Sequence, residues 1–496
     1  MEKTWRWFGK KDKITLPMLR QIGVEGVVTA LHDVPNGEIW ALEAIKSLKD
    51  YIESHQLRWS VVESLPVSEA IKYAGPERDQ LIENYKVSLA NLGKAGIKTV
   101  CYNFMPVIDW IRTDLEHPWE DGTSSLYFDK IRFAYFDCMI LQREGAEKDY
   151  TDLELQQVRE LDKTITEAEK NELVDTIIVK TQGFVNGNIK EGDRHPVTIF
   201  RRLLSLYDGI DRDALRENLR YFLQAVMPVC DEYGINMCIH PDDPPFQVLG
   251  LPRIVTGEED INWLLHAVDN PHNGLTFCAG SLSAGLHNNV PLLARMFAHR
   301  THFVHLRSTN AFPNGNFIEA SHLGGRAHVI ELIRIFEKER PGVPMRVDHG
   351  RMMLDDAGKG YNPGYSFHGR MMALAQIEGM MAVINEESNL NPRLTYILTL
   401  LARLHSSVMP LRARTYYPNR SRYRSRTWYP VPTDTSACLH SAHNFPLASD
   451  NVHFPSVGGI SCFLSVAYFS LIPHCLFPQT VVVVAGSVLA HLHPLH

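Results

Sequence analysis

Short apolar runs alternate with longer amphipathic stretches through the first 387 residues of the chain. The runs are brief, several are rich in β-branched residues, and most lack a two-residue alternation. This pattern is typical of parallel strands that are buried on both faces. The predicted strands are Glu25–Leu31, Arg58–Glu63, Lys98–Asn103, Asn236–His240, Leu275–Cys278, His302–Leu306, Pro344–Asp348 and Gly379–Ile384.

The stretches between these runs carry helical periodicity. Clear examples are Gln80–Ala95, Ala214–Glu232, Val290–Arg300 and His328–Lys338. Strands that alternate with helices predict a parallel sheet with right-handed crossovers, and eight such units predict a closed (β/α)8 TIM barrel. The alternative is an open doubly wound sheet, which is disfavoured because no glycine-rich phosphate loop follows the first predicted strand.

One connection is much longer than the others. It runs from Phe104 to Ile235, between the third and fourth predicted strands, and its segment Thr151–Lys180 is densely charged with a helix-start pattern. A structureless loop of this length is uncommon in a compact domain. We therefore predict a helical insertion over the barrel mouth at about residues 115–230.

Residues 388–496 break this pattern and carry a different charge. They hold eight arginines and two acidic residues, whereas residues 1–387 have a net charge of −13. The interpretations are a membrane anchor through Ser456–Ile472, an RNA-binding Arg/Tyr segment, and a poorly ordered extension such as a translated non-native reading frame. We favour the extension, because the apolar run is short for a membrane span and is followed by Pro473.

The charge and cysteine content indicate which partners and which compartment to expect. The net negative charge of residues 1–387 argues against a nucleic-acid partner for the barrel. The eight cysteines are dispersed without a CxxC motif, which indicates reduced thiols in the cytoplasm. The first residues contain no apolar secretory segment, and we expect no membrane partner.

Candidate ligands stand at the exits of four consecutive predicted strands. These residues are His240, Cys278, His305 and Asp348. In a TIM barrel the chemistry lies at the carboxyl ends of the strands, so these side chains should converge. Two imidazoles, a thiolate and a carboxylate suit a divalent metal, although the set alone does not select zinc, iron or manganese.

Other polar residues flank this proposed metal site. His349 follows Asp348 directly, and a turn at residues 362–365 can place Tyr365 over the site. Arg307 and Ser308 come just after His305, and an arginine fork with neighbouring hydroxyls suits a carboxylate or a phosphate.

Ten segments of the chain resemble the mannonate dehydratase family. They are TWRWFG (4–9), GVVTALHDVPNGEIW (26–40), WSVVESLPV (59–67), TVCYNFMPVIDWIRTDLE (99–116), HPDDPPFQVLGLPRIV (240–255), FCAGS (277–281), HLRST (305–309), HLGG (322–325), DHGRMMLDD (348–356) and NPGYSFHGR (362–370). The resemblance spans about residues 1–385 and does not extend into residues 388–496.

This resemblance implies a TIM barrel of the xylose isomerase-like superfamily and an enzyme of hexuronate breakdown. The family converts D-mannonate to 2-dehydro-3-deoxy-D-gluconate and water with Fe²⁺ or Mn²⁺. Its metal ligands fall on the four strand-end residues, and its proposed acid/base residues fall on His349 and Tyr365.

Three further residues are predicted to line the sugar chain: Asn103, Asp109 and Trp110. Arg307 is expected to hold the substrate carboxylate, and the protein is expected to form a homo-oligomer. Two other functions remain open at this point. One is a metal-dependent sugar isomerase or epimerase on the same scaffold, and the other is an RNA- or membrane-binding protein driven by residues 388–496.

Overall fold

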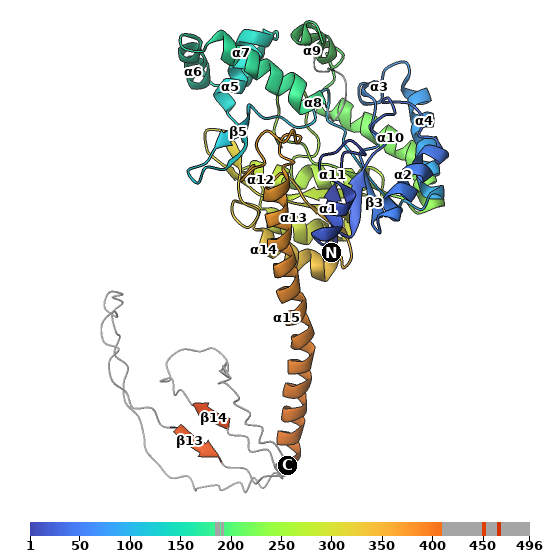
Figure 1. The fold of residues 1–496 in the computed structure, drawn as a ribbon, viewed down its shortest axis with the longest axis vertical. Coiled ribbons are helices and arrows are strands. Elements are labelled where there is room, and N and C mark those ends of the chain that lie inside the picture. Colours follow the sequence, from blue (N-terminus) through green and yellow to red (C-terminus); the bar gives the residue numbers. More distant parts are fainter. Residues whose placement is uncertain (184–188, 190–192, 409–448, 453–463, 468–496) are drawn as a thin grey trace, which may run out of the picture. The chain divides into compact units, whose positions relative to one another are not determined.

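Parallel strands close into a barrel in the computed structural model, which describes residues 1–183, 189, 193–408, 449–452 and 464–467 (Figure 1). Among these residues the barrel has eight strands in the order β1-β12-β9-β8-β7-β4-β3-β2. Their bounds are β1 (Glu2–Arg6), β2 (Gly26–Thr29), β3 (Arg58–Glu63), β4 (Thr99–Tyr102), β7 (Asn236–Ile239), β8 (Asn273–Cys278), β9 (Thr301–Leu306) and β12 (Pro344–Val347). The closed barrel is confirmed and the open sheet is excluded.

Two strand assignments from the sequence are corrected. Strand β1 was not predicted, because Glu2–Arg6 holds three charged residues and no apolar run. The predicted strand Gly379–Ile384 is helical and lies within α15 (Phe367–Val408). In this part of α15 the buried residues include Leu374, Ile377 and Ile384, which share one face of a helix with 3.6 residues per turn.

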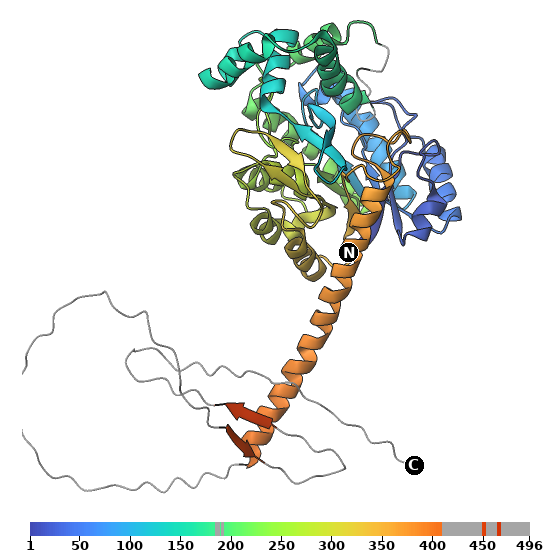
Figure 2. The same cartoon turned by 60° about the vertical axis from the view of Figure 1, so that its left-hand side comes forward.

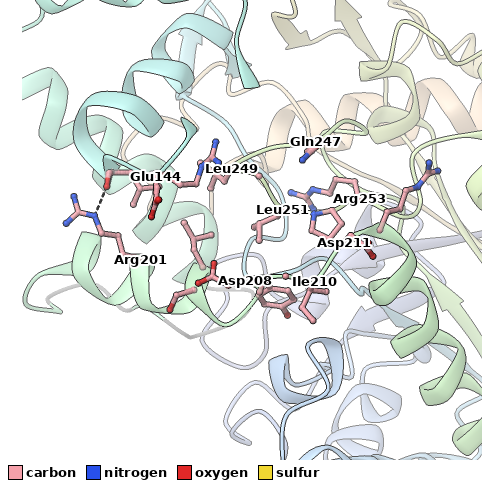
Figure 3. A pocket seen from close by; sticks show the side chains of 18 of the residues that line it. Glu144, Arg201, Asp208, Ile210, Asp211, Gln247, Leu249, Leu251 and Arg253 are labelled. Carbon is pink, nitrogen blue, oxygen red and sulfur yellow. Dashed lines mark hydrogen bonds between the residues drawn. The ribbon is translucent and has the colours of Figure 1, made fainter. Parts of the chain in front are cut away.

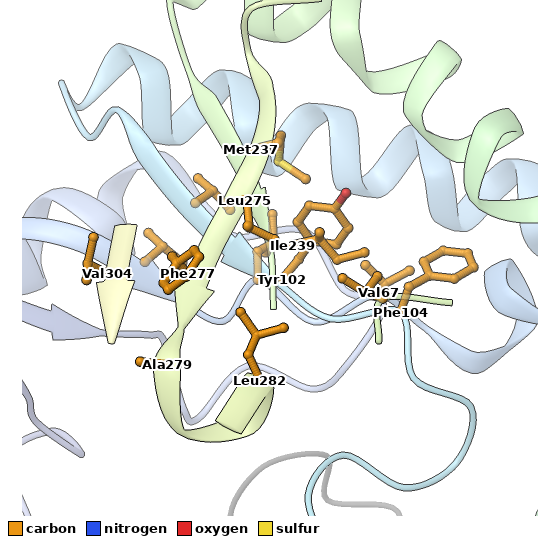
Figure 4. Close-up of a cluster of buried hydrophobic side chains, with 14 of the residues drawn as sticks. Val67, Tyr102, Phe104, Met237, Ile239, Leu275, Phe277, Ala279, Leu282 and Val304 are labelled. Carbon is orange, nitrogen blue, oxygen red and sulfur yellow. The ribbon is translucent and has the colours of Figure 1, made fainter. Parts of the chain in front are cut away.

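Helices surround the barrel as the amphipathic pattern predicts. They include α2 (Leu42–Ser54), α4 (Arg78–Lys94), α10 (Arg212–Tyr233), α11 (Glu258–Ala267), α13 (Val290–Phe297) and α14 (Val329–Glu339). Outward-facing strand residues such as Met237, Leu275 and Phe277 form the core between strands and helices (Figure 4). A separate small cluster of Val28, Val61, Cys101, Cys238 and Phe303 fills the barrel interior below the site.

The long insertion, counted here from Asn103, directly follows β4. Strand β4 is the fourth barrel strand rather than the third because β1 was missed. The insertion contains α5 (Lys130–Tyr135), α6 (Asp152–Asp162), α7 (Glu167–Val174), α8 (Thr181–Gly183) and α9 (Pro196–Ser205). Figures 1 and 2 both show these teal to green helices gathered at one end of the barrel. Capping boxes at Thr151 and Thr166 begin α6 and α7.

We expected a helical insertion, but the insertion also contains two β-strands. Its hairpin of β5 (Asp114–Pro118) and β6 (Ser124–Phe128) joins β10 (Thr309–Ala311) and β11 (Phe317–Glu319) in a sheet of order β10-β11-β6-β5. Strands β10 and β11 follow barrel strand β9 in the chain. This small sheet therefore links the insertion to the loop after β9.

The chain divides into two compact units, Met1–Pro410 and Leu411–His496. The boundary predicted at residue 387 falls inside α15, which continues to Val408. In the second unit β13 (Ser449–Val452) pairs with β14 (Leu464–Ala467). The predicted poor order of residues 409–448, 453–463 and 468–496 lies outside the described residues. Within the described part of the chain, no helix is long and apolar enough to cross a membrane.

Candidate metal centre and active site

Three predicted ligands converge at the carboxyl ends of neighbouring barrel strands. His240 directly follows β7, Cys278 ends β8 and His305 lies near the end of β9. One ligand atom from each lies within 4.8 Å of the others. The parallel register places Cys278 beside His305, which explains why residues far apart in the sequence meet here.

Asp348 supplies a fourth donor from the residue after β12. Its Oδ2 lies 3.7 Å from Cys278 Sγ and 3.8 Å from His305 Nδ1. Burial alone would raise the pKa of Asp348, but the nearby Arg346 and Arg307 guanidiniums and two histidines hold it well below its usual value. Two imidazoles, one thiol and one anionic carboxylate around one point are a suitable donor set for a divalent transition metal.

A small cavity of about 60 Å³ opens on this cluster. Its walls include the predicted residues Asn103, Asp109, Trp110, His240, Arg307, Asp348, His349 and Tyr365. Cys278 and His305 lie deeper and are fully buried. The cavity therefore joins the candidate metal ligands to the predicted acid/base residues.

His349 and Tyr365 face each other across the edge of this cavity. Their rings are 5.2 Å apart between centroids and nearly perpendicular, at 86°. Gly364 makes this approach possible, because a Cβ there would lie 2.9 Å from His349 Cδ2 and the residue has φ of +78°. Burial raises the pKa of Tyr365, so its phenol stays protonated at neutral pH.

Arg307 is held in the cavity by several partners. Its Nη2 donates to Asp243 Oδ2 at 2.6 Å, and its Nη1 lies 2.8 Å from His349 Nδ1 and 3.1 Å from Asp348 Oδ2. Ser308 is placed differently from the prediction. Its hydroxyl accepts a hydrogen bond from the Ala327 amide at 3.0 Å, and the residue is not among those that line the cavity.

The first residues of the insertion form another wall of the cavity. Asn103 donates to Asp109 at 2.9 Å, and the Trp110 ring lies 5.1 Å from the His349 ring. Gln182 of α8 accepts from the Asp109 amide at 3.0 Å and donates to the Trp110 carbonyl at 2.8 Å. The helical part of the insertion thus fixes residues that the sequence analysis predicted for substrate binding.

The family model described as D-mannonate dehydratase (UxuA) matches residues 1–391. The chain belongs to the D-mannonate dehydratase family. The mannonate dehydratase of Marinomonas sp. (strain MWYL1) is 46% identical over 390 residues, which cover 77% of this chain and 98% of the relative. That of Chromohalobacter salexigens is 42% identical over 395 residues, which cover 78% and 99%.

A solved structure agrees with this assignment. The crystal structure of mannonate dehydratase from Streptococcus suis serotype 2 has 34% sequence identity and a TM-score of 0.63, and the match covers 78% of this chain and 96% of that one. The resemblance inferred from the ten sequence segments is therefore confirmed. Members of the dehydratase family are hydro-lyases, and the sugar isomerase and tail-driven binding functions are not favoured.

Several charged residues of this dehydratase site were not among the residues predicted from the sequence. Glu63 ends β3 and contacts Arg346 at 3.0 Å and Arg6 at 3.3 Å. Glu63 could have been found, because it ends a predicted strand. Arg346 lies two residues before Asp348 and so on the same face of the strand. Arg6 was missed together with β1.

A second charged group was missed because it comes from three separate segments. It consists of Arg112 from the insertion, Asp243 from the loop after β7 and Glu319 from β11, and all three are buried. Burial would raise the pKa of Asp243 and of Glu319, but Arg112 and Arg307 hold both below their usual values. Both side chains are therefore carboxylates in the folded protein.

A larger groove of about 920 Å³ lies elsewhere between the insertion and the barrel (Figure 3). Arg201 and Asp208 on one side and Leu251 and Arg253 on the other are among its lining residues. None of the residues predicted for the dehydratase site lines this groove.

Proposed function

We propose that this chain dehydrates D-mannonate to 2-dehydro-3-deoxy-D-gluconate and water, with Fe²⁺ or Mn²⁺ as its metal. The observation that carries the proposal is the convergence of His240, Cys278, His305 and Asp348 on a cavity bordered by His349 and Tyr365. This arrangement occurs in a chain that matches the dehydratase family over residues 1–391.

The donor set supports a divalent transition metal ion at this site. A thiolate beside two imidazoles suits a softer ion than Mg²⁺ or Ca²⁺, which prefer oxygen donors. Bound there, the ion would act as a Lewis acid that stabilises negative charge on the substrate oxygens. Sugar isomerase metal sites usually consist of several Asp/Glu ligands, and a Cys278 thiolate fits such a site poorly.

The chain's own residues supply the proton transfers. Dehydration removes the proton from C2 and expels the hydroxyl group from C3, so it needs a base and an acid on the reacting face. We assign these steps to His349 and Tyr365, because both line the cavity and their rings are 5.2 Å apart. The protonated phenol is suited to donate to the leaving hydroxyl, and the imidazole is suited to accept the C2 proton.

Arg307 completes the proposed site as the group that holds the substrate carboxylate. It is buried at 2% exposure and has its guanidinium fixed beside both His349 and Asp348. Its positive charge attracts a carboxylate, and its N–H groups can donate to carboxylate oxygens. Asn103, Asp109 and Trp110 are proposed to contact the hydroxylated carbons of the sugar acid.

An anaerobic assay tests this function directly. Protein loaded with Fe²⁺ or Mn²⁺ should form a 2-keto acid from D-mannonate, whereas metal-free protein should not. D-gluconate is the matched control, because it differs from D-mannonate only at C2 and would give the same product on dehydration. Equal turnover of both acids, or none of either, would contradict the proposal.

We also propose a cytoplasmic location and a homo-oligomeric assembly. The location is supported by the five cysteines of the described residues, all of which are free thiols. Light scattering on the purified protein measures the assembly, and a monomer at working concentration would refute it.

A further inference from the structure

Arg112 lies beside the active site although it belongs to the insertion. Its side chain has no solvent exposure. Its Nη1 donates to Asp243 Oδ1 at 2.8 Å and its Nη2 donates to Glu319 Oε1 at 2.6 Å. Arg112 is not among the residues that line the cavity, so it would not touch a substrate there.

The two carboxylates that Arg112 binds each contact a proposed catalytic or substrate-binding group. Asp243 uses its other oxygen, Oδ2, to accept from Arg307 Nη2 at 2.6 Å. Glu319 Oε1 lies 3.2 Å from His349 Nδ1. Arg112 is therefore linked to Arg307 through Asp243 and to His349 through Glu319.

Arg112 also balances the negative charge that surrounds Arg307. Arg307 lies among three buried carboxylates, those of Asp243, Glu319 and Asp348, at 2.6, 3.4 and 3.1 Å. If Arg112 were absent, Asp243 and Glu319 would both depend on Arg307 and His349 for compensation, because a buried charge needs a partner. Arg307 would then be drawn away from the position in which it can bind a substrate carboxylate.

The surroundings of Arg112 hold its guanidinium in one orientation. It donates to the Ile111 carbonyl at 2.7 Å, and its Cζ lies 4.6 Å from the centre of the Phe317 ring. Phe317 and Glu319 belong to β11, which pairs with β6 of the insertion. The small sheet thus fixes both Arg112 and its Glu319 partner relative to the barrel.

We infer that Arg112 is a positioning residue for the dehydration, acting through Asp243 on Arg307 and through Glu319 on His349. This inference rests on the proposed function. It assigns to the insertion a part in catalysis beyond covering the barrel, because the insertion delivers the cation that keeps two functional groups in place. A lysine cannot reproduce the role, since one ammonium cannot present the planar fork that reaches both carboxylates.

The test compares Arg112→Ala with a matched control, Arg143→Ala. Arg143 also belongs to the insertion and also binds two carboxylates, Asp137 at 2.7 Å and Asp149, but it has no link to the cavity. For Arg112→Ala we expect unchanged metal content, a fall in kcat of about 10- to 100-fold and a raised KM for D-mannonate. Arg143→Ala should keep both constants.

Added guanidinium ion gives a readout that a purely structural role would not move. It should partly restore kcat and KM in Arg112→Ala by occupying the space of the missing group, and it should leave Arg143→Ala unchanged. If Arg112→Ala does not fold, Arg112→Lys replaces it, and we expect a smaller loss with metal retained. Wild-type constants in a folded, metal-loaded Arg112 variant would overturn the inference.

Wild-type turnover of D-mannonate is measured first, so that a failure of the proposed function can be distinguished from a failure of the role assigned to Arg112. No dehydration by the metal-loaded wild-type protein would refute the proposed function, and this inference with it. An active wild-type protein with equal losses in Arg112→Ala and Arg143→Ala, insensitive to guanidinium, would refute only the role of Arg112.

Discussion

Cys278 gives this site its chemical character at the scale of single residues. It ends β8, is fully buried, and receives a hydrogen bond from the Ser281 hydroxyl at 3.1 Å. A sulfur donor suits Fe²⁺ or Zn²⁺ better than hard cations such as Mg²⁺ and Ca²⁺, which bind mainly oxygen. If Cys278 is a ligand, its sulfur therefore disfavours Mg²⁺ and Ca²⁺ at this site.

Replacing Cys278 by serine should remove the metal while the fold stays intact. The substitution preserves size and exchanges an anionic sulfur for a neutral hydroxyl, which is a poor ligand for these metals. Metal content by mass spectrometry and a thermal melt test this expectation. Stoichiometric metal and full turnover in the variant would show that the four-ligand assignment is wrong.

Replacing His349 by asparagine should have a different effect. Asparagine keeps a polar side chain of similar reach but cannot transfer a proton at neutral pH. We expect kcat to fall by about 10²- to 10⁴-fold, as is typical of an acid/base group, with metal content preserved. Loss of metal together with activity would place His349 among the ligands.

The convergence of the four candidate ligands could be predicted, because each lies at or next to the carboxyl end of a strand whose apolar run is visible in the sequence. The pairing of Arg112 with Glu319 could not be predicted, because it depends on the contact between β11 and β6. The sequence separation of Arg112 and Glu319 leaves no local periodicity that would connect them.

At the scale of elements, the start of α15 is packed tightly against the loop that carries Tyr365. A Cβ on Gly369 would lie 2.0 Å from the Arg351 carbonyl oxygen, so any side chain would push the helix away from the loop. Arg370 adds to this junction by donating to the Tyr365 carbonyl at 2.9 Å. The helix start and the position of Tyr365 are therefore coupled.

Gly369→Ala should lower both the melting temperature and kcat, because backbone must shift to admit the methyl group. Gly379→Ala is the control in the same helix, where a Cβ would meet no atom within 4 Å. That change should stabilise the protein by about 0.5–1 kcal/mol, since alanine favours a helix interior over glycine. Equal melting temperatures for the two variants would contradict the packing argument.

Element prediction from the sequence succeeded for strands with a continuous apolar run and for helices with one apolar face. Seven of the eight barrel strands follow apolar runs, and α4, α10, α13 and α14 follow helical periodicity. It failed for β1, whose last three residues, Thr4, Trp5 and Arg6, are buried although the strand has no apolar run. It also failed for 379–384, because a short apolar run fits a strand and a helix equally well.

At the scale of the whole molecule, every residue of the proposed site belongs to the unit Met1–Pro410. The family match ends at residue 391, and α15 continues to Val408. The catalytic part of the chain therefore needs no residue beyond this unit in our interpretation.

A protein that ends at Pro410 should dehydrate D-mannonate with the same kcat and KM as the full chain. This end point leaves α15 whole, whereas an end at Leu390 would cut the helix. Steady-state kinetics of the two proteins at equal metal content provide the comparison. A folded but inactive shortened protein would show that residues after 410 contribute to the site.

The pairing of β1 with β12 has a consequence for how the protein is made. Glu2 pairs with Pro344, so the barrel cannot close until β12, its last strand in the sequence, has been synthesised and pairs with β1. Until then β1 and β9 are open edges, which are prone to pair with other chains. Asp348 follows β12 directly, so the segment that closes the barrel also brings in the fourth candidate metal ligand. A nascent chain stalled before residue 344 would thus lack both the closed barrel and the complete set of candidate ligands.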